Sequence, residues 1–161
     1  MRSLPRTLAT LTLLAFALPA AFAHTAGEEM TKAANAFLGS LTDAQRAKAT
    51  FAFDNPERTN WIFVPAVRKG LPIKEMNPGQ RHFAQALLAA SLSQRGHMKV
   101  ESVMGLEYLL FLIEEGKGAF TRDAENYFVS IFGKPDAHGT WGFRWEGHHC
   151  SQNFTIVDGT D

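Results

Sequence analysis

The sequence has a single cysteine, no net charge and almost no long apolar runs, and each shortage excludes a class of protein. Because Cys150 stands alone, no disulfide can form within the chain, which excludes a disulfide-stapled secreted scaffold. We interpret Cys150 as a small, buried and inert core residue. The 16 basic residues balance the 16 acidic ones and no basic cluster occurs, so we expect no nucleic-acid partner.

The one long apolar run lies at the N-terminus. Arg2 and Arg6 precede it, it is too short to span a bilayer comfortably, and Ala21-Phe22-Ala23 fits a small-x-small cleavage site. These features predict a secretory signal peptide over residues 1–23 and a mature single domain over residues 24–161. We therefore expect an exported protein, periplasmic or secreted, with no membrane insertion after signal removal.

The first part of the mature chain is predicted to be mainly helical. Apolar residues recur at helical spacing over residues 28–41, and the motif Thr42-Asp43-Ala44-Gln45 matches a capping box that begins a second, short helix. Asn77-Pro78 begins a third helix that breaks at Gly96. The run that follows, to Gly118, is apolar over most of its circumference, so we expect it to be the central and most buried helix.

Strands are predicted mainly in the last third of the sequence. Two short strands are expected at residues 50–53 and 60–64, where aromatic and β-branched residues are frequent. Three more are expected within residues 126–133, 140–147 and 151–159, and their short connections favour antiparallel pairing. The predicted fold class is α+β, with N-terminal helices packed on a small, mostly antiparallel sheet of C-terminal strands.

The stretch WEGHHCSQNF, Trp145 to Phe154, gathers side chains that can carry chemistry. In residues 141–146 the alternation of a strand places three aromatic residues on one face and Arg144 with Glu146 on the other. One face is thus predicted to be core and the other polar.

Beyond Gly147 the same alternation groups His149 with Ser151 and Asn153. Neighbouring strand residues point to opposite faces, so His148 joins that group only if Gly147 shifts the register.

Three interpretations of this stretch stay open. In the first, the fold brings His148 and His149 together with a remote ligand such as His82 to hold zinc or copper, although no sequence-local metal motif occurs. A mature N-terminal His24 could also chelate copper through its amino group and imidazole. In the second, His149 is a general base, Ser151 a nucleophile and Glu146 an orienting carboxylate. In the third, the polar side chains only hydrogen-bond within the sheet.

Arginine beside an aromatic residue can hold a carboxylate or a sugar-like ligand, although an ion pair at the rim is the commoner role. On this ground the candidate ligand-binding residues are Arg58, Trp61, Arg81, Arg144 and Asn153. Glu107 interrupts the apolar fourth helix, and we expect it to pair with one of these arginines rather than to act as a functional carboxylate.

The mature chain resembles a bacterial family of unknown function, numbered 3500, over residues 30–159. Six motifs carry the resemblance in order: ERTNW, RKGLPIKEM, QRHFAQALLAASLSQRG, IFGKP, WGFRWEGHH and NFTIVDG. Family members are about twice as long, so the resemblance implies that this chain is the N-terminal portion of a longer domain. It implies no activity. The most distinctive family motif corresponds to Gly147, His148 and His149 here, followed by Ser151 and Asn153.

Two positions depart from the family pattern. Cys150 stands where leucine is usual, which supports an apolar role, and His97 stands where tyrosine is usual, which argues against an obligatory ligand there. We expect an exported protein with a histidine-centred polar site that binds a metal ion or a small polar ligand and could hydrolyse it. The alternative is a non-catalytic binding or interaction module whose histidines are structural.

Overall fold

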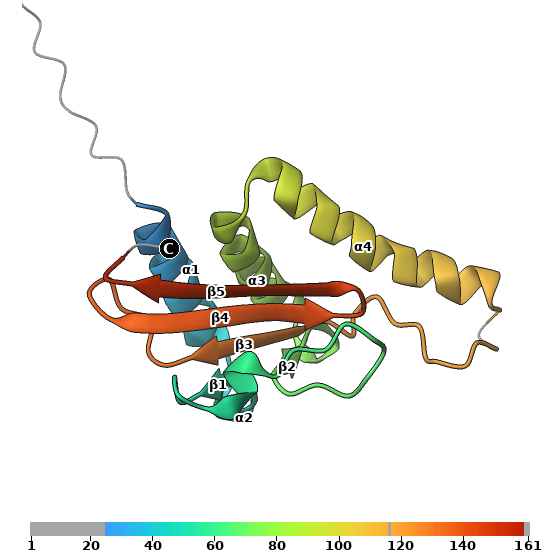
Figure 1. The fold of residues 1–161 in the computed structure, drawn as a ribbon, viewed down its shortest axis with the longest axis horizontal. Helices are drawn as coiled ribbons and strands as arrows, with labels where there is room; N and C mark the ends of the chain where they lie inside the picture. The colour runs from blue at the N-terminus through green and yellow to red at the C-terminus, as the bar shows by residue number, and fades with distance from the viewer. Residues whose placement is uncertain (1–24, 116, 160–161) are drawn as a thin grey trace, which may run out of the picture.

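The computed structural model describes residues 25–115 and 117–159, in which helices come first and most strands last (Figure 1). The fold is therefore α+β, as the sequence predicts. The predicted signal peptide and His24 lie outside the described residues. In chain order the elements are α1 (Ala26–Ser40), α2 (Asp43–Ala49), β1 (Thr50–Phe51), η1 (Pro56–Thr59), β2 (Leu71–Pro72), η2 (Ile73–Glu75), α3 (Pro78–Ser91), α4 (Gln94–Ile113), β3 (Phe128–Phe132), β4 (Thr140–Gly147) and β5 (Cys150–Val157).

Capping boxes fix where α1, α2 and α3 begin. The side chains of Thr25, Thr42 and Asn77 each accept a hydrogen bond from the backbone three residues on, and the side chain there accepts one from the cap backbone. Gln45 Nε2 also donates to Gln80 Oε1 at 3.0 Å, which joins the starts of α2 and α3. The capping box predicted at Thr42 is confirmed.

The sheet is built around an antiparallel meander of β3, β4 and β5. On the far side of the meander β3 also pairs with β1 in parallel and with β2 in antiparallel orientation. Register places Glu146 opposite Ser151 and Arg144 opposite Asn153 across β4 and β5. Cross-strand partners share a face, so these four side chains belong to one side of the sheet. The sequence predicts a common face for Arg144 and Glu146 and for Ser151 and Asn153, and the register joins the two pairs.

Helices α1 and α3 cover the other side of the sheet (Figure 1). There Trp141 and Phe143 of β4 pack in one cluster with Met30 of α1 and Leu87 of α3. Full burial of apolar side chains of this size stabilises the fold by about 1.5–3 kcal/mol each. The aromatic face of β4 is thus the core face.

The opposite, polar face of β4 is buried as well. Residues 53–69 cover it, and Arg144 and Glu146 are only 1% and 2% exposed. Two charged side chains at such depth need partners, and their partners define much of the candidate site.

The strand predicted at residues 60–64 is wrong, because these residues have no regular secondary structure. The carbonyls of Ile62 and Val64 accept hydrogen bonds from the guanidinium of Arg68 at 2.8 and 2.7 Å instead of pairing with a strand. The side chain of Arg68 thus provides the hydrogen bonds that a neighbouring strand would otherwise provide.

The sequence predicts that the fourth helix is the most buried one, and this prediction is wrong for α4. The helix break predicted at Gly96 is also wrong, because α3 ends at Ser91 and α4 begins at Gln94 after the Ser93 cap. The buried residues of α4 are Val100, Met104 and Glu107. Figure 1 shows the reason: α4 runs past the end of the sheet, so its C-terminal half has little to pack against. Its exposed large apolar residues are Met98, Leu106, Tyr108, Leu109, Phe111, Leu112 and Ile113.

Within residues 25–115 and 117–159, no helix combines the length and apolar character that crossing a membrane requires.

Candidate functional site

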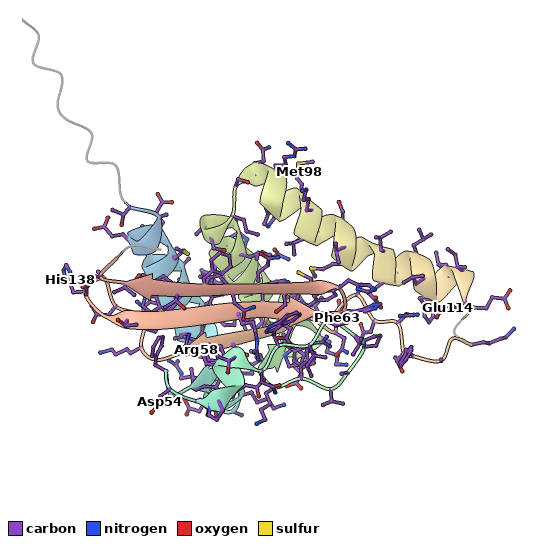
Figure 2. The ribbon with its side chains drawn as sticks, in the orientation of Figure 1. Asp54, Arg58, Phe63, Met98, Glu114 and His138 are labelled. Atoms are coloured by element: carbon purple, nitrogen blue, oxygen red, sulfur yellow. The ribbon has the colours of Figure 1, made fainter. Side chains whose placement is uncertain are left out.

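The paired histidines form the turn between the two longest strands. β4 ends at Gly147 and β5 begins at Cys150, so His148 and His149 are the two connecting residues. His149 has a left-handed φ of 54°, and its N–H donates to the carbonyl of Phe63 at 2.8 Å. Figure 2 places Phe63 near this end of the sheet. The irregular backbone removes the strand alternation on which the sequence grouping of His149 depends.

His148 links this turn to α4. Its Nδ1 is hydrogen-bonded to a carboxylate oxygen of Glu107, whose residue is only 5% exposed. Glu107 therefore pairs with a histidine, rather than with an arginine as expected from the sequence. In the tautomer that carries its proton on Nδ1 and donates to Glu107, Nε2 is the nitrogen left to accept a proton.

A tyrosine holds the same turn from the other side. Tyr127 Oη donates to the carbonyl of His148 at 2.9 Å. Burial, reinforced by the nearby carboxylate of Glu107, raises the pKa of Tyr127 above its ordinary value. The phenol therefore stays protonated and acts as a fixed donor.

The two imidazoles lie together but do not converge on a shared ion. Their ring centroids are 4.0 Å apart with 31° between the planes, so the in-plane lone pairs of His148 and His149 run nearly side by side. His82, the third predicted metal ligand, is exposed on α3 and packs against Phe83. Over the described parts of the chain, no three His, Cys, Asp or Glu side chains are grouped to hold a metal ion.

His149 faces the helical side of the sheet. It lines a cavity of about 250 Å³ with Cys150, Gln152 and residues of α4 that include Lys99. Cys150 is buried, and burial raises the pKa of its thiol to about 11, so it stays a neutral thiol at ordinary pH. The inert, buried Cys150 expected from the sequence agrees with this geometry.

Ser151 and Glu146 lie on the opposite side of the sheet from that cavity. Asn153 Nδ2 donates to Ser151 Oγ at 3.0 Å, and Ser151 pairs in register with Glu146. The carboxylate of Glu146 contacts two arginines instead of an imidazole: Arg68 Nε lies 2.8 Å and Arg144 Nε 2.9 Å from its two oxygens. The residues of the catalytic hypothesis therefore take part in separate interactions.

A buried ion network occupies the polar face of the sheet. Arg144 Nη2 also lies 2.7 Å from Glu57 Oε1, and its Nη1 donates to the backbone carbonyls of Glu57 and Asn60. Burial raises the pKa of Glu146, an effect that the positive charges of Arg144 and then Arg68 oppose. Two cations and two carboxylates balance in this network, which fixes the loop that covers the sheet.

Arg68 and Glu57 are the network residues that the sequence did not reveal. Arg68 donates to the carbonyls of Ile62, Val64, Ala66 and Gly147 in addition to contacting Glu146. Arg68 begins the family motif RKGLPIKEM, but it stands in an irregular segment, where no periodicity indicates its partners. Its position ties the loop of residues 60–68 to the end of β4, next to the histidine turn.

The other predicted ligand-binding residues lie in separate places. Arg58 stacks over Phe53, with its guanidinium carbon 4.5 Å from the ring centroid, and Trp61 is 57% exposed. Arg81 forms a bidentate pair with Glu125, in which Nη2 lies 2.9 Å from Oε2. Hydrogen bonding to Arg81 lowers the pKa of the Glu125 carboxyl. The structure thus assigns Arg81 and Arg144 carboxylate partners within the chain.

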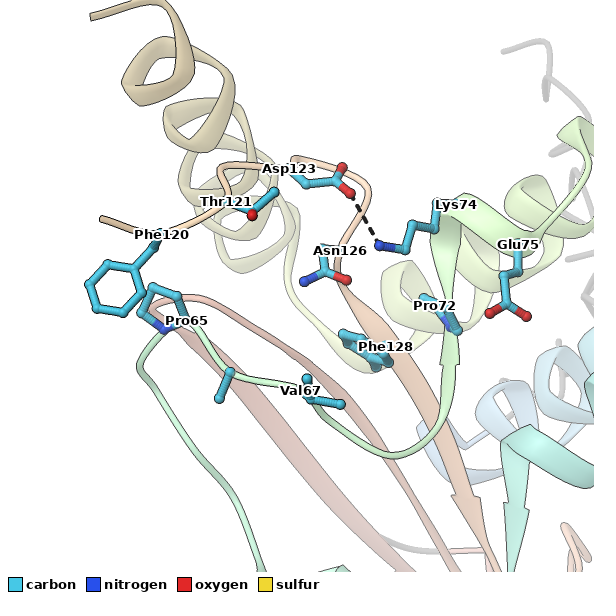
Figure 3. A pocket seen from close by; sticks show the side chains of 11 residues that line it. Pro65, Val67, Pro72, Lys74, Glu75, Phe120, Thr121, Asp123, Asn126 and Phe128 are labelled. Carbon is cyan, nitrogen blue, oxygen red and sulfur yellow. Dashed lines mark hydrogen bonds and ion pairs between the residues drawn. The ribbon is translucent and has the colours of Figure 1, made fainter. Parts of the chain in front are cut away.

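A depression of about 480 Å³ opens between the segment of Pro65–Val67 and the segment of residues 120–128. Figure 3 shows Asn126 between Lys74 and Pro65, with Phe120 at one rim. Lys74 Nζ and Asp123 Oδ2 are 3.4 Å apart across one wall. The lining residues are Pro65, Ala66, Val67, Pro72, Lys74, Glu75, Phe120, Thr121, Asp123, Asn126 and Phe128.

This depression adjoins the buried histidine pair. A narrow gap lined by Arg68, Glu107, Tyr127 and His148 shares Pro65 and three residues of the 121–126 segment with the depression. The walls of the depression come from three separate segments, within residues 65–67, 72–75 and 120–128, so no single sequence pattern indicates it. His148 lines only the narrow gap, whose volume is about 10 Å³, so four shared residues separate it from the open depression.

Comparison with known families gives one match, the model described as "Protein of unknown function (DUF3500)", over residues 23–161. None of the curated proteins and none of the solved structures compared with the chain matches it.

Proposed function

Since the chain belongs to the family described as protein of unknown function DUF3500, a description without an activity, we propose a function from the geometry. The protein is an exported binding protein for a small polar organic ligand, which occupies the depression between Pro65–Val67 and residues 120–128, behind which lies the His148–Glu107 pair. The observation that carries this proposal is the depression itself, of about 480 Å³, four of whose lining residues also line the narrow gap at the His148–Glu107 pair.

The size and lining of the depression indicate the class of ligand. A volume of about 480 Å³ falls within the range of roughly 300–1,000 Å³ that small-molecule sites occupy. Phe120 and the prolines offer apolar contact, whereas Asn126 and Thr121 offer hydrogen bonds. The long Lys74–Asp123 pair can open to bind a carboxylate and an ammonium, which favours a neutral or zwitterionic molecule over an anion.

The His148–Glu107 pair favours hydrolysis as a second candidate function. A carboxylate on Nδ1 holds an imidazole in the tautomer whose Nε2 can take a proton from water or from a hydroxyl. The non-catalytic alternative is favoured by the hydrogen bond of Tyr127 to the same turn, which gives His148 a structural role. We propose an organic ligand rather than zinc or copper, because the two neighbouring imidazoles do not converge.

Export rests on the sequence of residues 1–23, with Arg2 and Arg6 before the apolar run and Ala21-Phe22-Ala23 after it. Expression of the full chain in a Gram-negative host tests this. Recovery of a shortened protein starting at His24 in the periplasm or medium is expected, and an uncleaved cytoplasmic protein would contradict export.

Thermal denaturation with pools of free amino acids, monosaccharides and short carboxylic acids tests ligand binding. A ligand at about tenfold above its Kd stabilises the folded state by about 1.4 kcal/mol, which raises Tm by roughly 4 °C in a domain of this size. The shift should shrink in Phe120→Ala and Asn126→Ala. It should persist in Phe83→Ala, which truncates an exposed aromatic residue outside the depression.

Equal shifts in all variants, or none with any pool, would contradict the proposed site. Hydrolysis is tested separately on whichever compound binds. Turnover should be lost in His148→Gln and kept in His149→Gln, and binding without turnover would leave the protein a non-catalytic binding protein.

A further inference from the structure

One side of α4, facing away from the sheet, presents an apolar seam. The seam residues follow one another at intervals of four and three, a spacing that keeps one stripe of a helix in line along a neighbouring helix. It lies opposite the three buried residues of α4, and Met98, Leu109 and Leu112 are 61%, 48% and 52% exposed. The seam consists of Met98, Ser102, Gly105, Leu109 and Leu112, flanked by Leu106 and Ile113.

The exposed apolar area is large for one helix. The five large side chains of the seam and its flanks leave roughly 500 Å² of apolar surface open, which is in the range of the largest patch of a typical monomer, about 300–600 Å², a patch that is often functional. With the small seam residues and the stems of Arg95 and Lys99, this approaches the roughly 800 Å² per partner of a standard interface.

The N-terminal half of the seam is hollowed to receive side chains. A shallow groove of about 460 Å³ is lined by Arg95, Met98, Lys99, Ser102 and Val103, with the stems of the two basic residues as its rim. The C-terminal half has a shape complementary to this groove, because Leu109 and Leu112 project from it. Groove and projections lie at opposite ends of one helix, so two copies match when their helices run antiparallel.

We propose that a second copy of this chain docks on α4, giving a two-fold dimer of antiparallel α4 helices that cross at Gly105. In this arrangement Met98 of one copy lies opposite Leu112 of the other, so each leucine end seats in the groove of the other copy. A Cβ on Gly105 would meet nothing within 4 Å, so this face of the helix is open for close approach of another backbone.

Charge favours the same direction of pairing. The groove end carries Arg95 and Lys99, whereas Glu114 and Glu115 follow the other end of α4, where Glu114 already pairs with Arg122 at 2.8 Å and Glu115 is exposed. Crossing at Gly105 brings Arg95 near Glu115 of the other copy. Within its own chain, the carboxylate of Glu115 also lies 2.7 Å from Lys117 Nζ. A parallel pair would place the basic ends together, so the charges select the antiparallel pair.

Sedimentation of the purified protein over a wide concentration range tests the dimer. Wild type should be a dimer, and Leu109→Glu should halve the mass while keeping its circular dichroism, because residue 109 is half-exposed within the monomer. Val67→Glu places the same change at a 95% exposed site off the seam and should leave the dimer intact. A monomeric wild type, or a Leu109→Glu variant that stays dimeric, would overturn the proposal.

Cysteine cross-linking tests the direction. Gly105→Cys, on the two-fold axis, should form an intermolecular disulfide on mild oxidation. Met98→Cys should not, because the two copies of residue 98 would be roughly 21 Å apart along the axis. The buried native Cys150, with its thiol pKa of about 11, should not react. Cross-linking of both variants would indicate non-specific or parallel association and overturn the antiparallel pair.

Discussion

Replacing Arg68 by methionine should destabilise the protein severely. The substitution keeps an unbranched side chain but removes a guanidinium that is 2% exposed and lies 2.8 Å from Glu146 Oε1. Breaking one partner out of a buried ion pair costs about 3–5 kcal/mol, so we expect a loss of about 4 kcal/mol. Typical domains unfold with about 5–15 kcal/mol, so the variant should still fold but with a large fraction of its stability lost.

Urea unfolding followed by tryptophan fluorescence measures this loss, because Trp141 and Trp145 are buried and report on the core. The matched control is the double variant Arg68→Met/Glu146→Gln, in which the remaining Arg144–Glu57 pair is again balanced. It should be more stable than the sum of the single changes predicts. A single-variant loss below about 1 kcal/mol, or simple additivity, would refute the role given to this network.

The same variant has a predicted pH dependence. Burial raises the pKa of Glu146 in the wild type, and the loss of Arg68 should raise it further. A carboxyl with a higher pKa in the folded state favours folding most at low pH, and this contribution is lost as pH rises through the folded pKa. The stability deficit of Arg68→Met should therefore be smaller near about pH 5 than near about pH 8. A deficit independent of pH would mean that Glu146 does not carry the effect.

Three further predictions concern other residues. Gly147→Ala should destabilise by about 1–3 kcal/mol in urea unfolding, since the new Cβ would lie 2.2 Å from the ring of Tyr127, and an unchanged midpoint would contradict the close packing of that ring. Arg81→Gln should raise the pKa of Glu125 toward its ordinary value in a carboxyl NMR titration. In the wild type the lowered pKa of Glu125 stabilises the folded state at pH values above the ordinary carboxyl pKa. This stabilisation is lost as the pH falls through the pKa of the folded state. Cys150 should resist alkylation at neutral pH until the protein unfolds, and rapid labelling of the native protein would show an accessible thiol.

Local signals predicted where α2 and α3 begin and the faces of β4. The capping box at Thr42 and the cap formed by Asn77 with Pro78 act over a few residues, so they can be recognised directly in the sequence. The alternation of residues 141–146 likewise placed Arg144 and Glu146 on one face. These features were predictable because the atoms that cause them are neighbours in the chain.

The features missed from the sequence depend on distant contacts. The hydrogen bond of Arg68 to Gly147 spans 79 residues, and the pairing of His148 with Glu107 spans 41. The apolar pattern of α4 indicated burial but could not show that the helix runs past the sheet. The depression near His148 forms only when three separate segments meet, so no local pattern indicates it.

The pairing of β1 with β3 has a consequence for the order of folding. Thr50 of β1 lies beside Ile131 of β3, so this contact must close a long stretch of chain, whereas β3, β4 and β5 form from neighbouring segments. The meander should therefore form early, with the N-terminal helices docking on it afterwards. During synthesis α1 to α3 emerge before the strands that bury them, so their apolar faces stay open to chaperones until the last strands follow.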